Sequence, residues 1–230
     1  MRHRKVKNLD QRVEKTRHYI VENPKENKGK WREFFEGEQA SGADVADDLL
    51  DRKPLYIEIG CGKGKFLCAR AQADKDAVFL GIEGLDAVLI RGLERADEEQ
   101  IANVRFIMEY VADIRDYFAD GEVDGIYLNF SDPWPKPRHE KRRFTYGKTL
   151  LKYKQILKPG GFVAFKTDNE ELFEYSLGEV ERLQQEGELK MIEMSRDLHA
   201  SDYAAKEFTT EYEEKFHGKG KNINYLMVRF

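Results

Sequence analysis

The consecutive segments Leu55–Ile59 (LYIEI), Gly60–Gly64 (GCGKG) and Lys65–Ala73 (KFLCARAQA) decide the fold of this chain. The apolar run predicts a buried strand, the closely spaced glycines predict a turn that can take positive φ, and the residues after them predict a helix. Strand and helix patterns alternate from this point to the end of the sequence. Strands separated by helices indicate a parallel sheet with right-handed crossovers.

Further strands are expected over 77–82, 104–108, 125–130, 162–166, 189–195 and 223–230. The helices expected between them are one that Asp86 caps, and others over 113–118, 145–157, 170–185 (capped by Asn169 or Thr167) and 207–215. Because no long helix separates the last two strands, we expect the closing strand to return antiparallel. The predicted fold is therefore α/β, with a mostly parallel seven-stranded sheet, helices on both faces and an antiparallel last strand.

Length and composition favour one globular domain with extensions, since the chain has 230 residues and a mean hydropathy of −0.71. No run of 18 apolar residues exists, so no membrane helix is expected. The first ten residues (MRHRKVKNLD) lack the apolar stretch of a signal peptide, which favours the cytoplasm.

Residues 1–50 are interpreted as a basic N-terminal extension, with a short helix over 11–21 and an acidic linker over 41–51. Residues 51–230 form the main domain, on which Trp31, Phe34 and Phe35 of the extension could pack. The only cysteines, Cys61 and Cys68, lie near the glycine turn. Their spacing does not suggest zinc, and we expect two buried, reduced thiols.

Positive charge is concentrated in two places, although the net charge is −4. Residues 1–17 hold seven Lys or Arg against two acids, and residues 136–148 hold six against one. An acidic chain with two basic patches fits a protein that binds a nucleic acid on one face.

An acid follows the glycine turn at the end of the second predicted strand, where Glu83 lies 25 residues after Glu58. In doubly wound folds an acid at this place accepts hydrogen bonds from ribose hydroxyls. A dinucleotide fingerprint would need a third glycine where Lys65 stands, so pyrophosphate binding is disfavoured. The pattern favours a nucleoside cofactor; the alternative is a tight turn with a surface glutamate.

A second informative stretch follows the fourth predicted strand, from Asn129 to Arg143 (NFSDPWPKPRHEKRR). Its prolines brace a loop that carries Asp132 and Trp134, and ligands of open α/β sheets bind at the loops after the strands. The basic run that follows suggests a polyanionic ligand. Alternatively, Asp132 caps a turn before Pro133 and Trp134 packs in the core.

These motifs together resemble one family, the tRNA (guanine-N7-)-methyltransferases of bacteria, within the class I S-adenosylmethionine-dependent methyltransferases. The resemblance is carried by Ile57–Gly64 (IEIGCGKG), Gly81–Glu83 (GIE), Ser131–Lys136 (SDPWPK) with His139–Arg143 (HEKRR), Phe165–Asp168 (FKTD) and Thr210–Glu213 (TEYE). It implies a Rossmann-like fold, S-adenosyl-L-methionine as cofactor, and methylation of N7 of the variable-loop guanosine at position 46 of tRNA. It implies neither a metal nor a membrane partner, and the chain is expected to be a monomer or homodimer.

The resemblance also implies roles for particular residues. Asp132 is the expected catalytic residue, orienting the base through the guanine N1–H and exocyclic amine. The expected cofactor contacts are Glu58, Gly60, Gly62, Gly64, Glu83, Tyr110 and Asp132. The expected substrate contacts are Lys136, Asp168, Thr210, Glu211, Tyr212 and Glu213. The expected contacts to tRNA phosphates are Arg138, Lys141, Arg142 and Arg143.

Two other interpretations stay open. A non-catalytic RNA-binding protein on the same fold is favoured only by Tyr110, at a position where family members usually carry an acid or amide. A methyltransferase that acts on a small molecule or a protein leaves the basic run at 138–143 unexplained.

Overall fold

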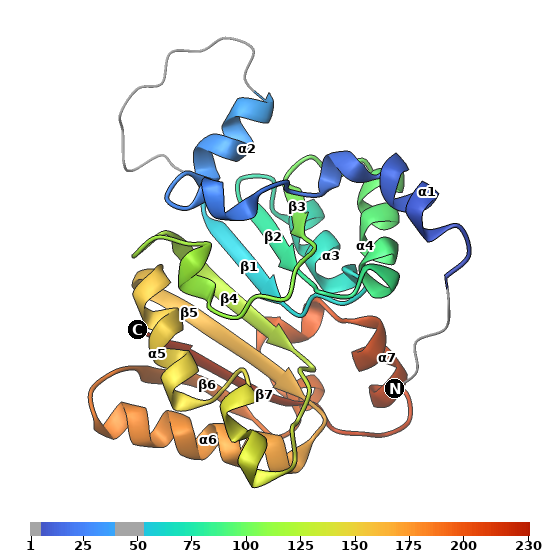
Figure 1. Cartoon of the computed structure of the whole chain (residues 1–230). Helices are drawn as coiled ribbons and strands as arrows, with labels where there is room; N and C mark the ends of the chain where they lie inside the picture. Colours follow the sequence, from blue (N-terminus) through green and yellow to red (C-terminus); the bar gives the residue numbers. More distant parts are fainter. Residues whose placement is uncertain (1–5, 40–52) are drawn as a thin grey trace.

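A seven-stranded sheet of order β3-β2-β1-β4-β5-β7-β6 forms the centre of the structure, a computed structural model that describes residues 6–39 and 53–230 (Figure 1). All pairs from β3 to β5 are parallel, and β7 runs antiparallel between β5 and β6, as expected for the closing strand. The strands are β1 (Leu55–Ile59), β2 (Val78–Ile82), β3 (Val104–Ile107), β4 (Val123–Asn129), β5 (Leu157–Thr167), β6 (Lys190–Ser195) and β7 (Asn224–Arg229).

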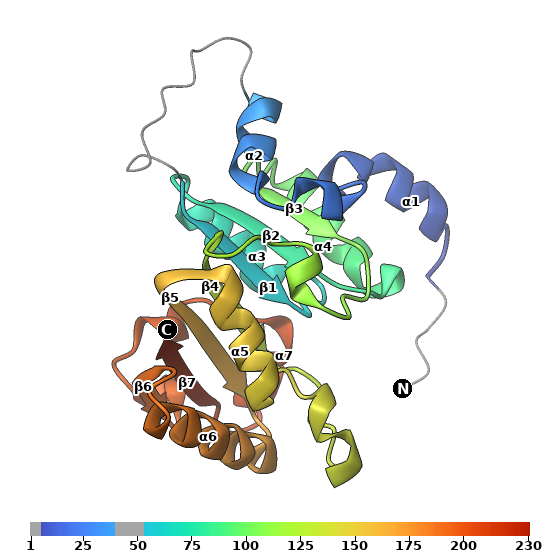
Figure 2. The same cartoon turned by 60° about the vertical axis from the view of Figure 1, so that its left-hand side comes forward.

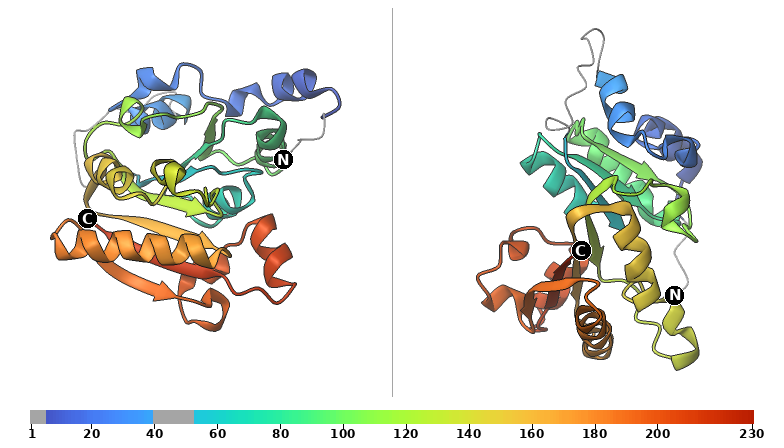
Figure 3. Two further views of the ribbon diagram at one scale, coloured as in Figure 1. Left: turned by 60° about the horizontal axis from the view of Figure 1, so that its bottom comes forward. Right: turned by 90° about the vertical axis from the view of Figure 1, so that its left-hand side faces the viewer.

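Helices cover both faces of this sheet (Figures 2 and 3). Alternate side chains of β1 point to opposite faces: Leu55 and Ile57 join the core under α5 and α6, whereas Tyr56 packs toward the α3 side. The helices are α1 (Leu9–Lys15), α2 (Trp31–Gln39), α3 (Lys65–Ala73), α4 (Asp86–Glu98), α5 (Gly147–Ile156), α6 (Glu170–Gln185) and α7 (Glu211–His217). None of the helices in the described ranges is long and apolar enough to cross a membrane.

Several expected boundaries are wrong, and tertiary pairing explains two of them. The helix expected over 11–21 ends at Lys15, because Ile20 and Val21 are extended and pair with Phe106 of β3. The fifth strand begins at Leu157 rather than 162, because Leu157 pairs with Val123 across an irregularity in β4.

Two other helix starts also differ from the expectation. The last helix runs over 211–217 instead of 207–215, with Thr210 as its cap. The helix after β2 takes Leu85, not Asp86, as its N-cap, whereas Asn169 caps α6 as expected by accepting from the Leu172 amide. The linker expected over 41–51 lies outside the described residues, as do residues 1–5.

The extension contributes α2, which is anchored in the main core by Trp31. This side chain is fully buried, stacks on Phe118 with ring centroids 5.5 Å apart, and donates its indole N–H to the Tyr117 carbonyl at 2.8 Å. The Glu122 carboxylate accepts from the Trp31 amide at 3.0 Å. Arg32 also forms an ion pair with the buried Asp124, at 2.6 Å. The helix α2 is thus part of the folded core.

Replacing Trp31 with Ala should lower the free energy of unfolding by about 3–5 kcal/mol, because it removes a large buried aromatic side chain. Phe34→Ala is the matched control, since Phe34 is only half-buried, and its cost should be clearly smaller. Urea unfolding of both variants measures the difference. Equal small losses would contradict the anchoring role of Trp31.

Candidate functional site

The carboxyl ends of β1, β2, β4 and β5 meet at one edge of the sheet because these strands are parallel neighbours. Their arrowheads point toward the region of α7 in Figure 1. Register places Ile59 beside Ile82, and Asn129 beside Lys166. The residues that follow these strands include the glycine turn, Glu83 and the Asp132 loop, so motifs far apart in the sequence converge at this edge.

The glycine turn has the backbone conformation that its residues predict. Gly60, Gly62 and Gly64 have φ values of +74°, +58° and +69°, a region that side-chain-bearing residues rarely adopt. A Cβ on Gly64 would also lie 2.9 Å from the Cα of Gly92, so α3 and α4 can approach closely only with glycine there. Glu83 fixes the turn by accepting from the Gly62 amide at 3.2 Å.

Cys61 and Cys68 are buried and free, as expected. Burial raises the pKa of the Cys61 thiol, and it raises that of Cys68 to about 12. Both therefore pack as small apolar groups. Among residues 6–39 and 53–230, no three His, Cys, Asp or Glu side chains are grouped so that they could hold a metal ion.

Glu58 is a buried acid, and one of its two carboxylate oxygens has no hydrogen-bond partner in the described structure. Its Oε1 accepts from the Asn129 side-chain amide at 2.8 Å, whereas its Oε2 has no hydrogen-bond partner in the described structure. Burial raises the pKa of Glu58 to about 8, although the Asn129 hydrogen bond and the Lys166 charge act in the opposite direction. A buried carboxylate oxygen without a partner is costly, so this position suits a ligand that brings a cation.

Tyr110 lies beside Glu83, with its side chain 73% exposed. Its ring rests on Gly84, where an added Cβ would be only 2.5 Å from the ring carbons. The tyrosine thus forms an exposed aromatic wall next to Glu83, the acid that follows β2. Only glycine at position 84 permits this contact.

The loop after β4 is strained on both sides of Asp132. Phe130 and Trp134 have φ values of +54° and +43°, and each such residue costs about 1–3 kcal/mol. Asp132 itself is exposed, and its carboxylate forms no hydrogen bond or ion pair with any described residue. Strain that the surrounding structure holds in place is typical of functional loops.

Arg143 holds this loop, a role that the sequence does not reveal. Its Nε and Nη2 donate to the carbonyls of Pro133 and Trp134, both at 3.1 Å, and its guanidinium lies over the Tyr175 ring. Arg142 lies over the Trp134 indole at 4.8 Å. Arg138 and Lys141 are exposed, as is Lys136 at the start of this segment. The 3₁₀ turn Pro137–Arg142 protrudes from the sheet beside α5 (Figure 2).

A buried ion pair ties the C-terminal segment to β5. The Lys166 ammonium lies 3.2 Å from the Glu213 carboxylate and donates to the carbonyls of Ala205 and Phe208 at 2.7 and 2.8 Å. The side chains of Lys166 and Glu213 are 3% and 0% exposed. Burial lowers the pKa of Lys166, and the Glu213 carboxylate acts against that shift.

Glu213 is expected to contact the substrate, and in this structure its carboxylate pairs with Lys166. Because it is fully buried, its carboxylate supports the segment from beneath. The other residues of this region that are expected to contact the substrate lie closer to the surface. Thr210 caps α7, Glu211 pairs with Arg95 at 3.0 Å, and Asp168 accepts from Tyr212 at 3.5 Å and from Lys221 at 3.1 Å.

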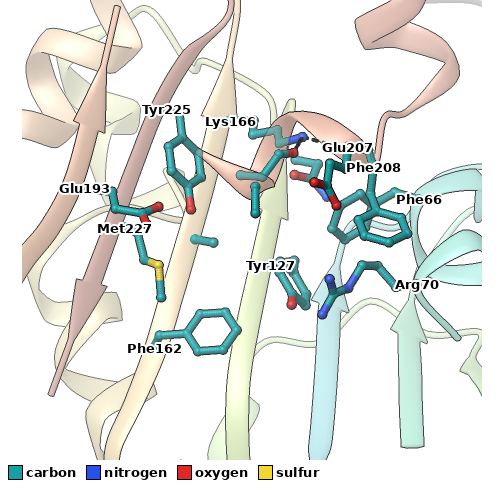
Figure 4. A pocket seen from close by; sticks show the side chains of 14 residues that line it. Phe66, Arg70, Tyr127, Phe162, Lys166, Glu193, Glu207, Phe208, Tyr225 and Met227 are labelled. Carbon is teal, nitrogen blue, oxygen red and sulfur yellow. Dashed lines mark hydrogen bonds between the residues drawn. The ribbon is translucent and has the colours of Figure 1, made fainter. Parts of the chain in front are cut away.

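A separate cavity of about 200 Å³ lies over the sheet face beside α3 (Figure 4). None of the residues expected to contact the cofactor or the substrate lines this cavity. Two of its lining residues also hold residues of the carboxyl edge: Asn129 donates a hydrogen bond to Glu58, and Lys166 forms the ion pair with Glu213. The cavity therefore shares a wall with that edge. Its lining is Phe66, Arg70, Tyr127, Asn129, Phe162, Ala164, Lys166, Glu193, Ala204, Ala205, Glu207, Phe208, Tyr225 and Met227.

Replacing Lys166 with Met should lower the free energy of unfolding by about 3–5 kcal/mol, because it leaves the buried Glu213 charge with only the His199 imidazole, 3.0 Å away, as its partner. The double variant Lys166→Met with Glu213→Leu should recover much of that loss. Lys154→Met breaks a half-exposed pair with Glu188 and should cost about 1 kcal/mol or less. Urea unfolding that gave Lys166→Met and Lys154→Met the same cost would contradict the role of the buried pair.

Comparison with known proteins places this geometry in a family. The family described as "Putative methyltransferase" matches residues 52–226. The tRNA (guanine-N(7)-)-methyltransferase of Halalkalibacterium halodurans is 44% identical over 211 residues, which cover 92% of this chain and 87% of that protein. The protein of the same name from a Geobacillus species is 42% identical over 212 residues, covering 92% and 88%.

A solved structure supports the fold independently. The SAM-dependent methyltransferase from Aquifex aeolicus matches 94% of this chain and 97% of its own, with a TM-score of 0.52 at 15% identity. This likeness shows that the sheet and its helices form a class I methyltransferase fold. Because the identity to the two bacterial relatives, 42 to 44%, extends over 92% of the chain, the protein belongs to the family of tRNA (guanine-N(7)-)-methyltransferases.

Proposed function

We propose that this protein transfers a methyl group from S-adenosyl-L-methionine to N7 of the guanosine at position 46, in the variable loop of tRNA. The observation that carries the proposal is Asp132. Its exposed carboxylate, without a protein partner in the described structure, stands on a strained loop at the sheet edge that also holds the glycine turn.

The residues around the glycine turn fit the cofactor. The methionine ammonium supplies the cation that the unpartnered Oε2 of buried Glu58 lacks. Glu83 keeps acceptor capacity for the ribose hydroxyls beyond its two bonds to the backbone amides of Gly62 and Leu85. Tyr110 offers its exposed ring to the adenine. When bound, the cofactor supplies a methyl group on a sulfonium.

Asp132 acts on the other reactant. Guanine N7 carries a lone pair and no proton, so the reaction needs no strong base, and the residue instead orients the base by accepting from its N1–H and exocyclic amine. Methylation leaves a positive charge on the guanine ring, which a nearby carboxylate stabilises. Holding two reactants in line can by itself supply effective molarities of about 10⁵ M or more.

The remaining expected residues bind the tRNA around this point. The proposed contacts to the base or the neighbouring ribose are Lys136, Asp168, Thr210, Glu211, Tyr212 and Glu213. Arg138, Lys141 and Arg142 contact phosphates. Arg143 contacts a phosphate as well, in addition to holding the loop through the Pro133 and Trp134 carbonyls. The target nucleotide has to leave its stack, at a cost of a few kcal/mol.

The proposal is tested by incubating the protein with labelled S-adenosylmethionine and unmodified tRNA transcripts. One set carries the variable-loop guanosine, and the other carries adenosine in its place. Nucleoside digestion should yield labelled 7-methylguanosine only from the first set. No label in either set would favour a non-catalytic RNA-binding protein.

Asp132→Ala should reduce methyl transfer by about 100-fold or more, because the base loses its orienting acceptor and its charge partner. Affinity for S-adenosylhomocysteine should change little. Asp76→Asn, on an exposed loop before β2, is the control and should keep full activity. Unchanged activity in Asp132→Ala would remove this residue from the site.

Cofactor affinity should rise with pH between about 6 and 8. Glu58 has a pKa of about 8 in the ligand-free protein against 4.5 ordinarily, and an arriving ammonium favours its charged form. Ligand binding below pH 8 should therefore release a proton from Glu58.

Calorimetry with S-adenosylhomocysteine in two buffers of different ionisation enthalpy counts the released protons. Glu58→Gln should bind more weakly and lack this proton release. Equal proton counts in the wild type and in Glu58→Gln would contradict the assignment of the ammonium to Glu58.

A further inference from the structure

A row of aromatic rings leads away from the Asp132 loop along α7. Phe130, which precedes that loop, lies 5.0 Å from the Tyr212 ring, and Tyr212 stacks on Phe216 with centroids 4.2 Å apart and planes 29° apart. Tyr212 is 43% exposed. The row is therefore continuous from the catalytic loop to the surface.

Three lysines surround the outer end of this row. The ammonium groups of Lys215, Lys219 and Lys221 lie 5.4, 5.5 and 5.3 Å from the Phe216 ring centroid. Lys221 is paired with Asp168, whereas Lys215 and Lys219 have no anionic partner in the described parts of the chain. Like charges gathered at one ring repel each other, and the π face is a weak substitute for an anion.

The acids of α7 do not neutralise these lysines, because they are used elsewhere. Glu211 pairs with Arg95 of α4, Glu213 with Lys166 of β5, and Glu214 with Lys65 of α3. The helix thus directs its negative charge into the protein. Residues 215–221 (KFHGKGK), with three lysines and no acid, remain on the outside.

We propose that Tyr212, Phe216, Lys215, Lys219 and Lys221, here termed the aromatic–lysine platform, bind an unstacked nucleotide adjacent to the target guanosine. Lys215 and Lys219 turn from the Phe216 ring to the phosphates, and the base stacks on the ring row that they vacate. Exposed aromatic rings flanked by cations are typical of single-stranded nucleic-acid sites. The inference rests on the proposed function and adds a second RNA contact, separate from the Arg138–Arg143 run.

The lysine contribution is tested by the binding of an unmodified tRNA transcript to the full-length protein, measured by fluorescence anisotropy with S-adenosylhomocysteine at several salt concentrations. Lys215→Gln with Lys219→Gln should weaken binding about 10-fold and lower the salt slope by about 1.4, for two lost phosphate contacts at about 0.7 each.

Lys75→Gln with Lys190→Gln is the matched control. It removes the same charge from two exposed lysines near the amino ends of β2 and β6, at the opposite edge of the sheet. Its salt slope should equal that of the wild type. Equal slopes and affinities for the platform and control variants would overturn the lysine contacts.

The ring contribution is tested with Phe216→Leu and Phe216→Tyr. Loss of a stacked base typically weakens binding about 5- to 150-fold, so Phe216→Leu should raise the KM for tRNA at least about 5-fold. The value of kcat and the affinity for S-adenosylhomocysteine should stay near those of the wild type. Phe216→Tyr keeps the ring and should restore KM.

The outcomes separate the inference from the proposed function. A wild type that makes no 7-methylguanosine refutes the proposed function. A wild type that does make it, with platform variants that bind tRNA as the wild type does, refutes the platform alone. A loss in Phe216→Leu that Phe216→Tyr does not recover also refutes stacking.

Discussion

The buried ion pair between Lys166 and Glu213 is the interaction on which the rest of the site depends. Lys166 is the penultimate residue of β5, and its ammonium has four acceptors in the segment 205–213: two carbonyls and the two oxygens of the Glu213 carboxylate. A buried pair of this kind contributes little net stability compared with apolar residues, but it tolerates only one arrangement of its partners. It therefore fixes where α7 lies relative to the Asp132 loop. Together with the Glu211–Arg95 and Glu214–Lys65 pairs, that tie holds the acids and rings of the C-terminal segment at the site edge.

The sheet topology was predictable from the sequence because each local pattern agreed with the global fold. The strand Leu55–Ile59 and the helix Lys65–Ala73 match the expected boundaries, since the glycines between them leave one way for the chain to turn. The exceptions lie where a distant partner overrides a local preference. Ile20 and Val21 leave a helical pattern to pair with β3, and Leu157 joins a strand although Pro159 and two glycines follow it. Single-sequence periodicity does not contain those partners.

The sequence predicted the motif residues of the site better than it predicted the buried side chains that support them. Motif resemblance placed the glycine turn, Glu83 and Asp132 at one sheet edge, and strand register brings them there. Resemblance does not show which side chains face inward: Glu213 is expected at the substrate, and only the structure shows that it is fully buried against Lys166. The supports were missed for the same reason: Asn129 under Glu58, Lys166 under α7 and Arg143 behind the loop all act through partners distant in sequence. Tyr110 departs from the family pattern, and only the structure shows that it leans on Gly84.

We propose that the guanine and the cofactor meet at the carboxyl edge of β1 and β4, and not in the neighbouring cavity over the sheet face. A structure of the protein bound to S-adenosylhomocysteine and tRNA would distinguish these two places. We expect the guanine N7 to face the cofactor sulfur beside Asp132, with the cofactor amino group against Glu58. A guanine seated between Phe66, Tyr127 and Tyr225 in the cavity, away from Asp132, would contradict it.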